Sequence, residues 1–308
     1  MIQESHNKLP NLFIPGAGKS GTSTLHILLN QHPDICMSTM KEPHFWTNPK
    51  LDIAKNLQEY LDLFEEKDKK YLGESSTGYM CFPFFIKRIK EHYPTTPKFI
   101  FILRNPIDRL YSHYWWLKGI GSENLSLKKA ISNDFNIAPN QDLKLAEGAY
   151  KMYYQFGLYG KWIQRFYNEF NASNIHIITT EDLANNQTET LNSCFTFLGL
   201  KNIASETIKE KSNSTKILKL PFLYKVSKKL AFNEYGFKKV LKPFFPEKTR
   251  RYINENIHTF IYKLTATSKE YPTITKEERL WLKSLYEEDV KLLKTVTNKN
   301  FNEWQDFN

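Results

Sequence analysis

The chain is poor in cysteine and has no long apolar run. Its 308 residues include three cysteines without the spacing of metal ligands, so we predict that Cys36, Cys81 and Cys194 are buried free thiols in a reducing compartment. No window approaches the roughly 18 apolar residues of a membrane-spanning helix. The stretch from Met1 to Pro10 lacks the apolar region of a signal peptide. These absences predict a cytoplasmic protein, and we expect a bacterial one.

Positive charge is concentrated in one stretch of the chain. The formal net charge is +10, and residues 216–251 hold eleven lysines and arginines against two acids, interleaved with seven aromatic residues. Two interpretations stay open for this stretch. It forms either an amphipathic helix pair whose lysines face solvent, or a surface for an anionic or amphiphilic partner such as a glycan or a membrane. Nucleic acid is the less favoured partner.

Apolar runs alternate with amphipathic segments along the chain. Strands are predicted over 12–14, 35–37, 70–74, 98–103 and 174–178. Helices are predicted over 21–30, 51–65, 104–117, 188–198, 249–267 and 275–296. This alternation predicts an α/β fold with a doubly wound parallel sheet flanked by helices. We expect residues 1–308 to form one domain, with a core over about 8–215 and a mostly helical, basic part over about 216–308.

A glycine-rich turn follows the first predicted strand and leads into a helix. Glycines let the backbone approach an anion closely, and a helix N-terminus presents unpaired N–H groups and a partial positive charge. We therefore predict an oxyanion site formed by Gly18, Lys19, Ser20, Gly21, Thr22 and Ser23. Gly18-Lys-Ser20 matches the end of a Walker A motif, but Phe13 stands where that motif has its first glycine. A P-loop kinase that uses ATP is therefore kept as an alternative.

A second basic turn follows the strand predicted over 98–103. Arg104 comes directly after this strand and Ser112 two helical turns later, and an arginine fork with a hydroxyl donor suits a phosphate group. The two turns together resemble the sulfotransferases that use 3′-phosphoadenylyl sulfate (PAPS). The resemblance implies that the segment Lys19-Ser-Gly-Thr-Ser holds the 5′-phosphosulfate and that Arg104 and Ser112 hold the 3′-phosphate.

Further segments strengthen this resemblance, above all to the carbohydrate sulfotransferases of the heparan sulfate type and their bacterial relatives. Lys41-Glu-Pro-His-Phe-Trp46 is similar to a family segment whose glutamate is the catalytic base, which implies that role for Glu42. His44 is then expected to share this role or to orient the acceptor. Residues 73–79 resemble a turn in which relatives have lysine at the position of Ser75.

Other segments extend the resemblance over nearly the whole chain. Residues 157–159 and the tail around Trp304 resemble family segments, and Ser23 stands where some relatives have arginine. In the family a basic loop after the last strand covers the 3′-phosphate and the adenine. The resemblance implies this function for two residues at the corresponding place, Lys211 and Ser212.

The resemblance also implies an activity. It is the transfer of a sulfuryl group from PAPS, a co-substrate used without a metal, to a hydroxyl or amine of a glycan, a glycolipid or a small natural product. Lys19 would stabilise the transferring charge and Glu42 would deprotonate the acceptor. A nucleotide- or polyanion-binding protein without catalysis is the alternative outside the enzymes. His113 is a weaker candidate base, and Asp108 and Arg109 fit a plain ion pair on a helix surface.

Overall fold

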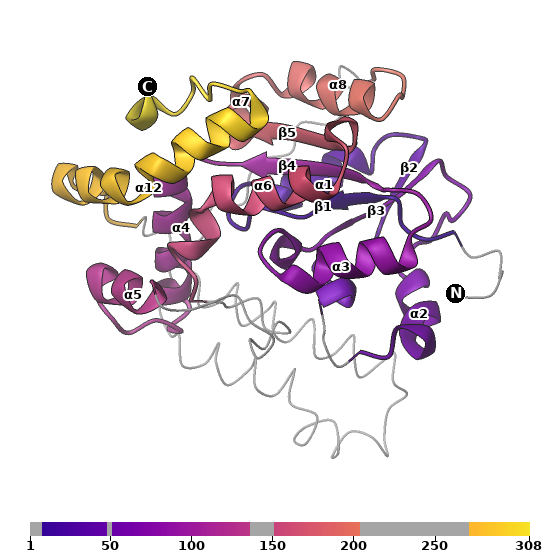
Figure 1. The fold of residues 1–308 in the computed structure, drawn as a ribbon, viewed down its shortest axis with the longest axis horizontal. Coiled ribbons are helices and arrows are strands. Elements are labelled where there is room, and N and C mark those ends of the chain that lie inside the picture. The colour runs from indigo at the N-terminus through magenta and orange to yellow at the C-terminus, as the bar shows by residue number, and fades with distance from the viewer. Residues whose placement is uncertain (1–7, 48–50, 136–150, 204–270) are drawn as a thin grey trace, which may run out of the picture.

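Five short parallel strands form one sheet in the part of the chain that the computed structural model describes, residues 8–47, 51–135, 151–203 and 271–308 (Figure 1). The strands are β1 (Leu12–Ile14), β2 (Ile35–Met37), β3 (Tyr71–Ser75), β4 (Lys98–Leu103) and β5 (Ile175–Thr179). Their order is β2-β3-β1-β4-β5, and every neighbouring pair is parallel. This arrangement confirms the predicted doubly wound α/β fold. It places the turns after β1 and β4 side by side at the carboxyl edge of the sheet.

Apolar side chains of the strands alternate between the two faces of the sheet. In β1, Phe13 packs into one core, whereas Leu12 and Ile14 pack into another. The core around Leu12 and Ile14 is completed by α1 (Thr22–Leu29), α7 (Thr180–Asn185) and α8 (Gln187–Phe197). The core around Phe13 is completed by α2 (Ile53–Leu61), α3 (Pro83–His92), α4 (Pro106–Gly119), α5 (Leu127–Asp134), α6 (Tyr159–Glu169) and α12 (Lys276–Thr297). Short 3-10 helices lie at Phe45–Thr47, Thr77–Met80, Gln155–Gly157, Ala172–Asn174 and Gln305–Phe307.

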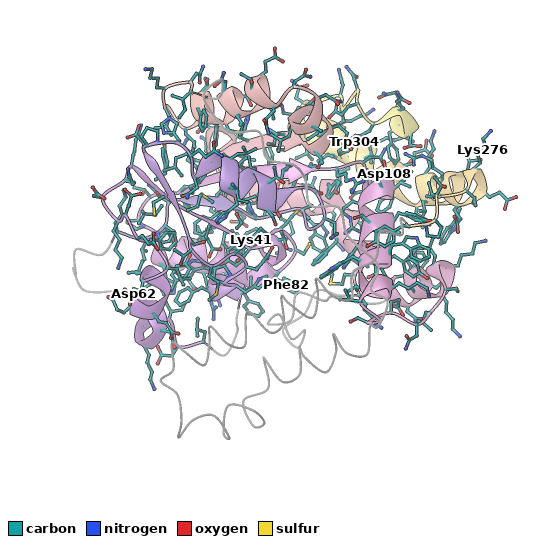
Figure 2. All side chains as sticks on the ribbon, turned by 180° about the vertical axis from the view of Figure 1, so that it is seen from behind. Lys41, Asp62, Phe82, Asp108, Lys276 and Trp304 are labelled. Atoms are coloured by element: carbon teal, nitrogen blue, oxygen red, sulfur yellow. The ribbon has the colours of Figure 1, made fainter. Side chains whose placement is uncertain are left out.

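Helix α12 lies against α4 and α6, far from both in sequence (Figure 1). The approach to α6 needs glycine, since a Cβ on Gly160 would come within 2.3 Å of the carbonyl oxygen of Asp289. The Asp289 carboxylate accepts the N–H groups of Gly160 and Lys161 at 2.8 and 2.9 Å, so it caps the first turn of α6. The segment after α12 is anchored by the fully buried Trp304, which Figure 2 shows near Asp108 of α4.

The strand boundaries agree with the sequence predictions to within one residue. The helix predicted over 51–65 is shorter, because Asp52 caps the N-terminus of α2 by accepting the N–H of Lys55 at 3.2 Å and the chain turns again after Leu61. Helices α3, α5, α6 and α7 are additions that the sequence pattern did not predict. The helix predicted over 249–267 and the basic stretch 216–251 lie outside the described residues.

The three cysteines are buried free thiols, as predicted. In the described part of the chain, no helix combines the length and the apolar character needed to span a membrane.

Candidate active site

The glycine turn is tied to the neighbouring strand β4 on its way from β1 to α1. The N–H of Ala17 donates to the Ile102 carbonyl at 2.8 Å, which continues the pairing of β1 with β4 beyond the strand. The hydroxyl of Thr180 lies 2.6 Å from the Ser20 carbonyl and 3.0 Å from that of Leu103, and so joins the turn to the end of β4. The turn is therefore held in place by its neighbours before any ligand is present.

The turn ends at the N-terminus of α1, which is open to an anion. Gly21 is the N-cap residue and has a left-handed backbone (φ 89°), a conformation that glycine adopts without strain. No side chain caps the helix here, so the N–H groups of its first turn and the positive end of the helix dipole are available. Thr22 is buried and Ser23 is exposed.

Ser20 differs from its neighbours in the turn. Its side chain is fully buried, and its hydroxyl is close enough to the Tyr159 phenol of α6 to moderate the rise in the pKa of Tyr159 that burial causes. Its N–H donates to the Ala17 carbonyl at 3.3 Å. The Ser20 side chain thus belongs to the packing of the turn against α6.

Lys19 lies in a cluster of positive charges. Burial, followed by the charges of Arg104, Arg109 and Lys41, lowers the pKa of Lys19 to about 8. Its Nζ lies 5.0 Å from the ring centroid of Trp116 on α4, a cation–π distance. A buried ammonium group surrounded by other cations is electrostatically unfavourable by itself, and an anion bound among them would relieve this repulsion.

The contact with Trp116 brings the glycine turn to the second predicted phosphate site. Ser112 lies one helical turn before Trp116 on α4, so the two residues share one face of the helix. Arg104 directly precedes Asn105, the N-cap residue of α4, and Arg104 and Ser112 are both half-buried. The structure therefore brings the two basic turns together at the carboxyl edge of the sheet.

Glu42 is held at the site by β3 and the turn that follows it. Its main-chain N–H donates to the Ser75 carbonyl at 2.9 Å. The Thr77 N–H donates to Glu42 Oε2 at 2.8 Å, and the Thr77 hydroxyl lies 3.1 and 3.2 Å from the two carboxylate oxygens. Lys41 Nζ lies 2.7 Å from Oε1. The sequence had singled out the segment containing Thr77, but not this contact.

These contacts keep Glu42 ionised. Burial alone would raise the pKa of Glu42, but the charge of Lys41 and the hydrogen bonds from Lys41 and Thr77 contribute to lowering it below its usual value overall. The side chain nevertheless retains 30% of its exposed surface, so solvent or an acceptor can reach it.

His44 lies behind Glu42 and is buried more deeply. Its Nε2 is 3.3 Å from Glu42 Oε2, and its side chain is only 10% exposed. Burial lowers the pKa of His44; Glu42 opposes this shift and Lys41 adds to it. The imidazole is therefore neutral at pH 7, and since a carboxylate only accepts hydrogen bonds, Nε2 carries the proton toward Glu42. This geometry suits an orienting residue.

A second carboxyl group lies on the same strand as Ser75. Glu74 is fully buried, and burial raises its pKa to about 8, against the effect of hydrogen bonds from Tyr79 and Tyr60. The Tyr60 hydroxyl lies 3.1 Å from Glu74 Oε2. Glu74 is thus neutral and enclosed at pH 7, whereas Glu42 is charged and accessible, which singles out Glu42 as the candidate base.

The three candidate catalytic residues share an unusual backbone. Lys19, Glu42 and His44 have φ values of 68°, 59° and 52°, in the left-handed region that non-glycine residues seldom adopt. Only Asn298 and Phe301 share this feature among the other non-glycine residues in the described part of the chain. Such a conformation costs on the order of 1 kcal/mol or more for each residue and clusters at functional sites, where surrounding contacts maintain it.

The structure corrects one interpretation of α4. Asp108 and Arg109 do not form a surface pair, because Arg109 is fully buried, with its Nη1 3.3 Å from Nδ1 of His113 and a hydrogen bond to the Tyr153 carbonyl. Asp108 instead pairs with Arg279 of α12. His113 is itself buried, which leaves it no access to an acceptor. Two candidate donor-binding residues, Lys211 and Ser212, lie outside the described residues.

The carboxyl edge of the sheet thus combines clustered cations with the uncapped N-terminus of α1, features that suit an anionic ligand and occur in α/β proteins that bind nucleotides at a topological switch point. Comparison with known proteins narrows this class, because the model of the sulfotransferase domain family matches residues 9–292. The chain belongs to the sulfotransferase family.

Two sequence relatives illustrate the similarity. Carbohydrate sulfotransferase 15 of Mus musculus is 25% identical over 256 residues, which covers 65% of this chain and 46% of the relative. Bifunctional heparan sulfate N-deacetylase/N-sulfotransferase 2 of Homo sapiens is 25% identical over 209 residues, which covers 64% of this chain and 23% of the relative. The chain thus spans less than half the length of either relative.

A solved structure shares the whole fold. The sulfotransferase from Alicyclobacillus acidocaldarius superposes with a TM-score of 0.63 at 22% sequence identity, covering 97% of this chain and 99% of that one. At this identity the match supports the fold.

Proposed function

We propose that this protein transfers a sulfuryl group from PAPS to a hydroxyl or amine of a glycan, a glycolipid or a small natural product, with Glu42 as the base. The observation that carries the proposal is the convergence of Lys19 and the Ser112-bearing face of α4 through Trp116. Lys41 connects this place to the ionised and accessible Glu42, because it contacts the Glu42 carboxylate and its charge also acts on Lys19. Family membership sets the class of reaction.

The residues present fit PAPS, which carries two separate anionic groups. Lys19 and the open N-terminus of α1 suit the phosphosulfate end. Arg104 and Ser112 form a second donor set on a neighbouring strand end, which suits the 3′-phosphate. A mononucleotide without a 3′-phosphate would use only the first of these sets, so the double arrangement favours PAPS over AMP or ATP.

The side chains have distinct functions in the proposed reaction. PAPS supplies, when bound, the electrophilic sulfuryl group. Lys19 is placed to stabilise negative charge that develops on the leaving oxygen, and removing one such donor costs about a hundredfold to a thousandfold in rate. Glu42 accepts the proton of the acceptor as the new sulfur–oxygen or sulfur–nitrogen bond forms. His44 orients the Glu42 carboxylate from its buried side.

The names of the two relatives favour a carbohydrate acceptor, since one is called a carbohydrate sulfotransferase and the other a heparan sulfate N-sulfotransferase. Two serines that stand where some relatives have basic residues favour an acceptor that is less anionic than heparan sulfate. Ser75 takes the place of a lysine in the resembling turn, and its hydroxyl lies 2.8 Å from Nδ1 of His26, a buried ring whose pKa burial lowers to about 4. Ser23 takes the place of an arginine in some relatives. Both positions therefore lack positive charge at pH 7.

Transfer of labelled sulfate tests the proposal. Purified protein is incubated with ³⁵S-labelled PAPS and separate pools of oligosaccharides, glycolipids and small alcohols and amines. We expect at least one pool to gain label. Glu42→Gln should lower the rate by about a hundredfold or more, yet leave the affinity for the desulfated nucleotide PAP nearly unchanged. Glu59→Gln makes the same substitution at an exposed position of α2 and serves as the matched control.

Two outcomes would reject the proposal. Phosphoryl transfer from Mg²⁺-ATP, together with stronger thermal stabilisation by Mg²⁺-ATP than by PAP, would identify a kinase. The second outcome is a protein that binds PAP, gives no labelled product in any pool and binds PAP equally well as the Glu42→Gln variant. It would identify a nucleotide-binding protein without catalysis.

A further inference from the structure

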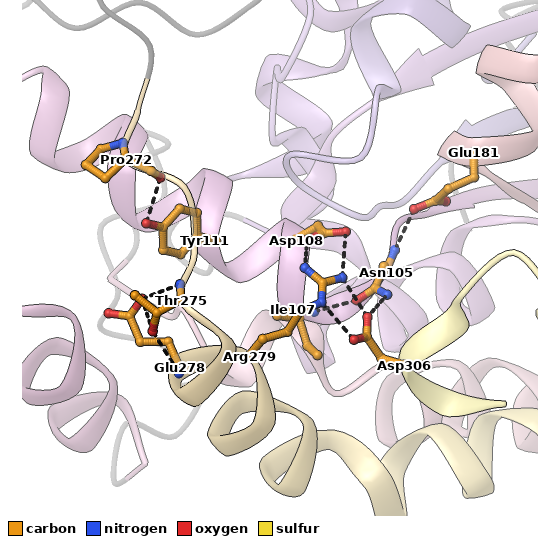
Figure 3. Close-up of polar contacts among 10 residues, drawn as sticks. All are labelled: Asn105, Ile107, Asp108, Tyr111, Glu181, Pro272, Thr275, Glu278, Arg279 and Asp306. Atoms are coloured by element: carbon orange, nitrogen blue, oxygen red, sulfur yellow. Dashed lines mark hydrogen bonds and ion pairs between the residues drawn. The ribbon is translucent and has the colours of Figure 1, made fainter.

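An arginine of α12 bridges two carboxylates close to the Arg104 turn. Arg279 Nη1 lies 2.9 Å from Asp108 Oδ1, and its Nε and Nη2 lie 2.7 and 2.6 Å from the two carboxylate oxygens of Asp306 (Figure 3). Asp108 belongs to the first turn of α4, and Asp306 to the segment after α12. A fork-to-fork contact of this kind fixes the orientation of both partners, and not only their distance.

The bridge reaches the main chain next to Arg104 through Asn105. The Asn105 side-chain amide donates to Asp306 Oδ2 at 2.7 Å, and its Oδ1 accepts the N–H of Ile107 at 3.0 Å. The main-chain N–H of Asn105 donates to Glu181 Oε1 at 3.0 Å. Asn105 is therefore held from three directions, and the peptide group that joins it to Arg104 has little freedom (Figure 3).

The position of Arg279 is itself fixed. Thr275 and Glu278 form a capping box at the start of α12, and the Tyr111 hydroxyl of α4 donates to the Pro272 carbonyl at 2.8 Å. These contacts hold the first turns of α12 against α4 (Figure 3). Arg279 thus lies on a rigid element and is not a loose surface side chain.

We propose that Arg279, acting through Asp306 and Asn105, positions Arg104 for recognition of the 3′-phosphate. This inference rests on the proposed function and names the residues that make its donor site selective for a 3′-phosphate. Arg279 is a positioning residue in this proposal, because its guanidinium contacts carboxylates and not the nucleotide.

The Arg279 bridge also affects the electrostatic environment of the Arg104 turn. Three carboxylates lie around the turn that we propose binds the 3′-phosphate, those of Asp108, Asp306 and Glu181. Carboxylates repel phosphate. Arg279 neutralises part of this negative charge. Its loss would leave the Asp108 and Asp306 carboxylates without their arginine partner next to the Arg104 turn, so their negative charge would weaken phosphate binding there.

The two ion pairs of the bridge differ in exposure. The Arg279 and Asp108 side chains are 34% and 33% exposed, and an ion pair with such access to water contributes little to folding. The Asp306 side chain is only 14% exposed, so its bidentate pair with Arg279 can also support the fold. A loss that is selective for PAP over AMP distinguishes positioning of the turn from support of the fold, since a change in the fold would weaken the binding of both nucleotides.

Binding of two nucleotides that differ only in the 3′-phosphate tests the inference. Dissociation constants for PAP and for AMP are measured by calorimetry with the full-length protein. Arg279→Ala should weaken PAP binding about tenfold, the equivalent of losing one charge-assisted hydrogen bond, and leave AMP binding nearly unchanged. Asp306→Ala should give a smaller selective loss, because it breaks the same chain of contacts but also removes a carboxylate that repels phosphate. Arg279→Lys should also lose less PAP affinity than Arg279→Ala. Lys291→Ala removes an exposed ion pair from the same helix and should change neither constant.

The double variant Arg279→Ala/Asp306→Ala sharpens the result. It should lose no more PAP affinity than Arg279→Ala alone, since both substitutions act along one chain of contacts. Equal loss of PAP and AMP binding, or unchanged PAP binding in both single variants, would overturn the inference. A wild-type protein that binds AMP as tightly as PAP would instead reject the donor site of the proposed function, so the two failures are distinguishable.

Discussion

The candidate donor site has two halves that are held in different ways. The loop half comprises residues 16–24 with Lys41–His44, and it is held by main-chain contacts to the adjacent strands β3 and β4 and by the hydroxyls of Thr77 and Thr180, which lie just after strands of the sheet. The turn half comprises residues 104–112, and it is held by the side chains of Arg279 and Asp306, which follow about 170 to 200 positions later in the chain.

The difference between the halves corresponds to the chemistry proposed for each. The loop half contains the residues expected to act on the transferring group, and it keeps them in strained left-handed backbone. The turn half is expected to bind a group that undergoes no reaction, and α4 begins there with Asn105 as an N-cap residue. Strain is therefore found where reactivity is proposed, and an arginine–carboxylate bridge where only recognition is proposed.

Lys19→Met provides the largest test of this comparison. The variant keeps the length and apolar character of the side chain but removes the charge from the loop half. We expect the turnover number to fall about a hundredfold to a thousandfold, measured as transfer of ³⁵S-sulfate at saturating PAPS. Selectivity for PAP over AMP should persist, since the turn half is intact. A variant that keeps its turnover number and loses only affinity would show that the loop half also serves recognition alone.

Within the loop half, sequence reasoning predicted the glycine turn because the features of that turn are local. Glycines, a lysine and a helix start follow one strand within about ten residues, and the parallel sheet then places this turn beside the one after β4. The candidate residues Glu42 and His44 came from resemblance to a family. Nothing in composition or periodicity indicated that Thr77 would bind both carboxylate oxygens.

The turn half was only partly predictable, because its contacts join residues distant in sequence. Asp108 and Arg109 are adjacent and oppositely charged, which favoured a surface pair. On a helix, however, neighbouring residues point about 100° apart, so Arg109 enters the core while Asp108 meets α12. The partners Arg279 and Asp306 follow from the packing of α12 on α4 and α6, which no local pattern specifies.

Arg104→Ala tests the turn half with an intermediate effect. We expect PAP affinity to fall roughly ten- to a hundredfold, as for the loss of a bidentate phosphate contact, with AMP affinity nearly unchanged. The turnover number at saturating PAPS should change far less than in Lys19→Met, because the reacting groups lie in the loop half. Calorimetry and initial rates provide the two measurements. Arg88→Ala, an arginine on α3 outside both halves, is the control. A drop in the turnover number as large as that of Lys19→Met would contradict the division into halves.

The smallest expected effect is the uptake of a proton by Lys19, in the loop half, when PAP binds. Without a ligand, the pKa of Lys19 is about 8, and a bound anion favours the charged form and raises it. PAP binding at pH 8 should therefore take up about half a proton, and affinity should fall about tenfold from pH 7 to pH 9. Calorimetry in buffers of different ionisation enthalpy measures the uptake. Lys19→Arg should abolish it, whereas Arg104→Ala should reduce it without abolishing it, because the titrating group remains but loses one of the charges that lower its pKa. Uptake that persists in Lys19→Arg would assign the proton to another group and remove the electrostatic distinction between the two halves.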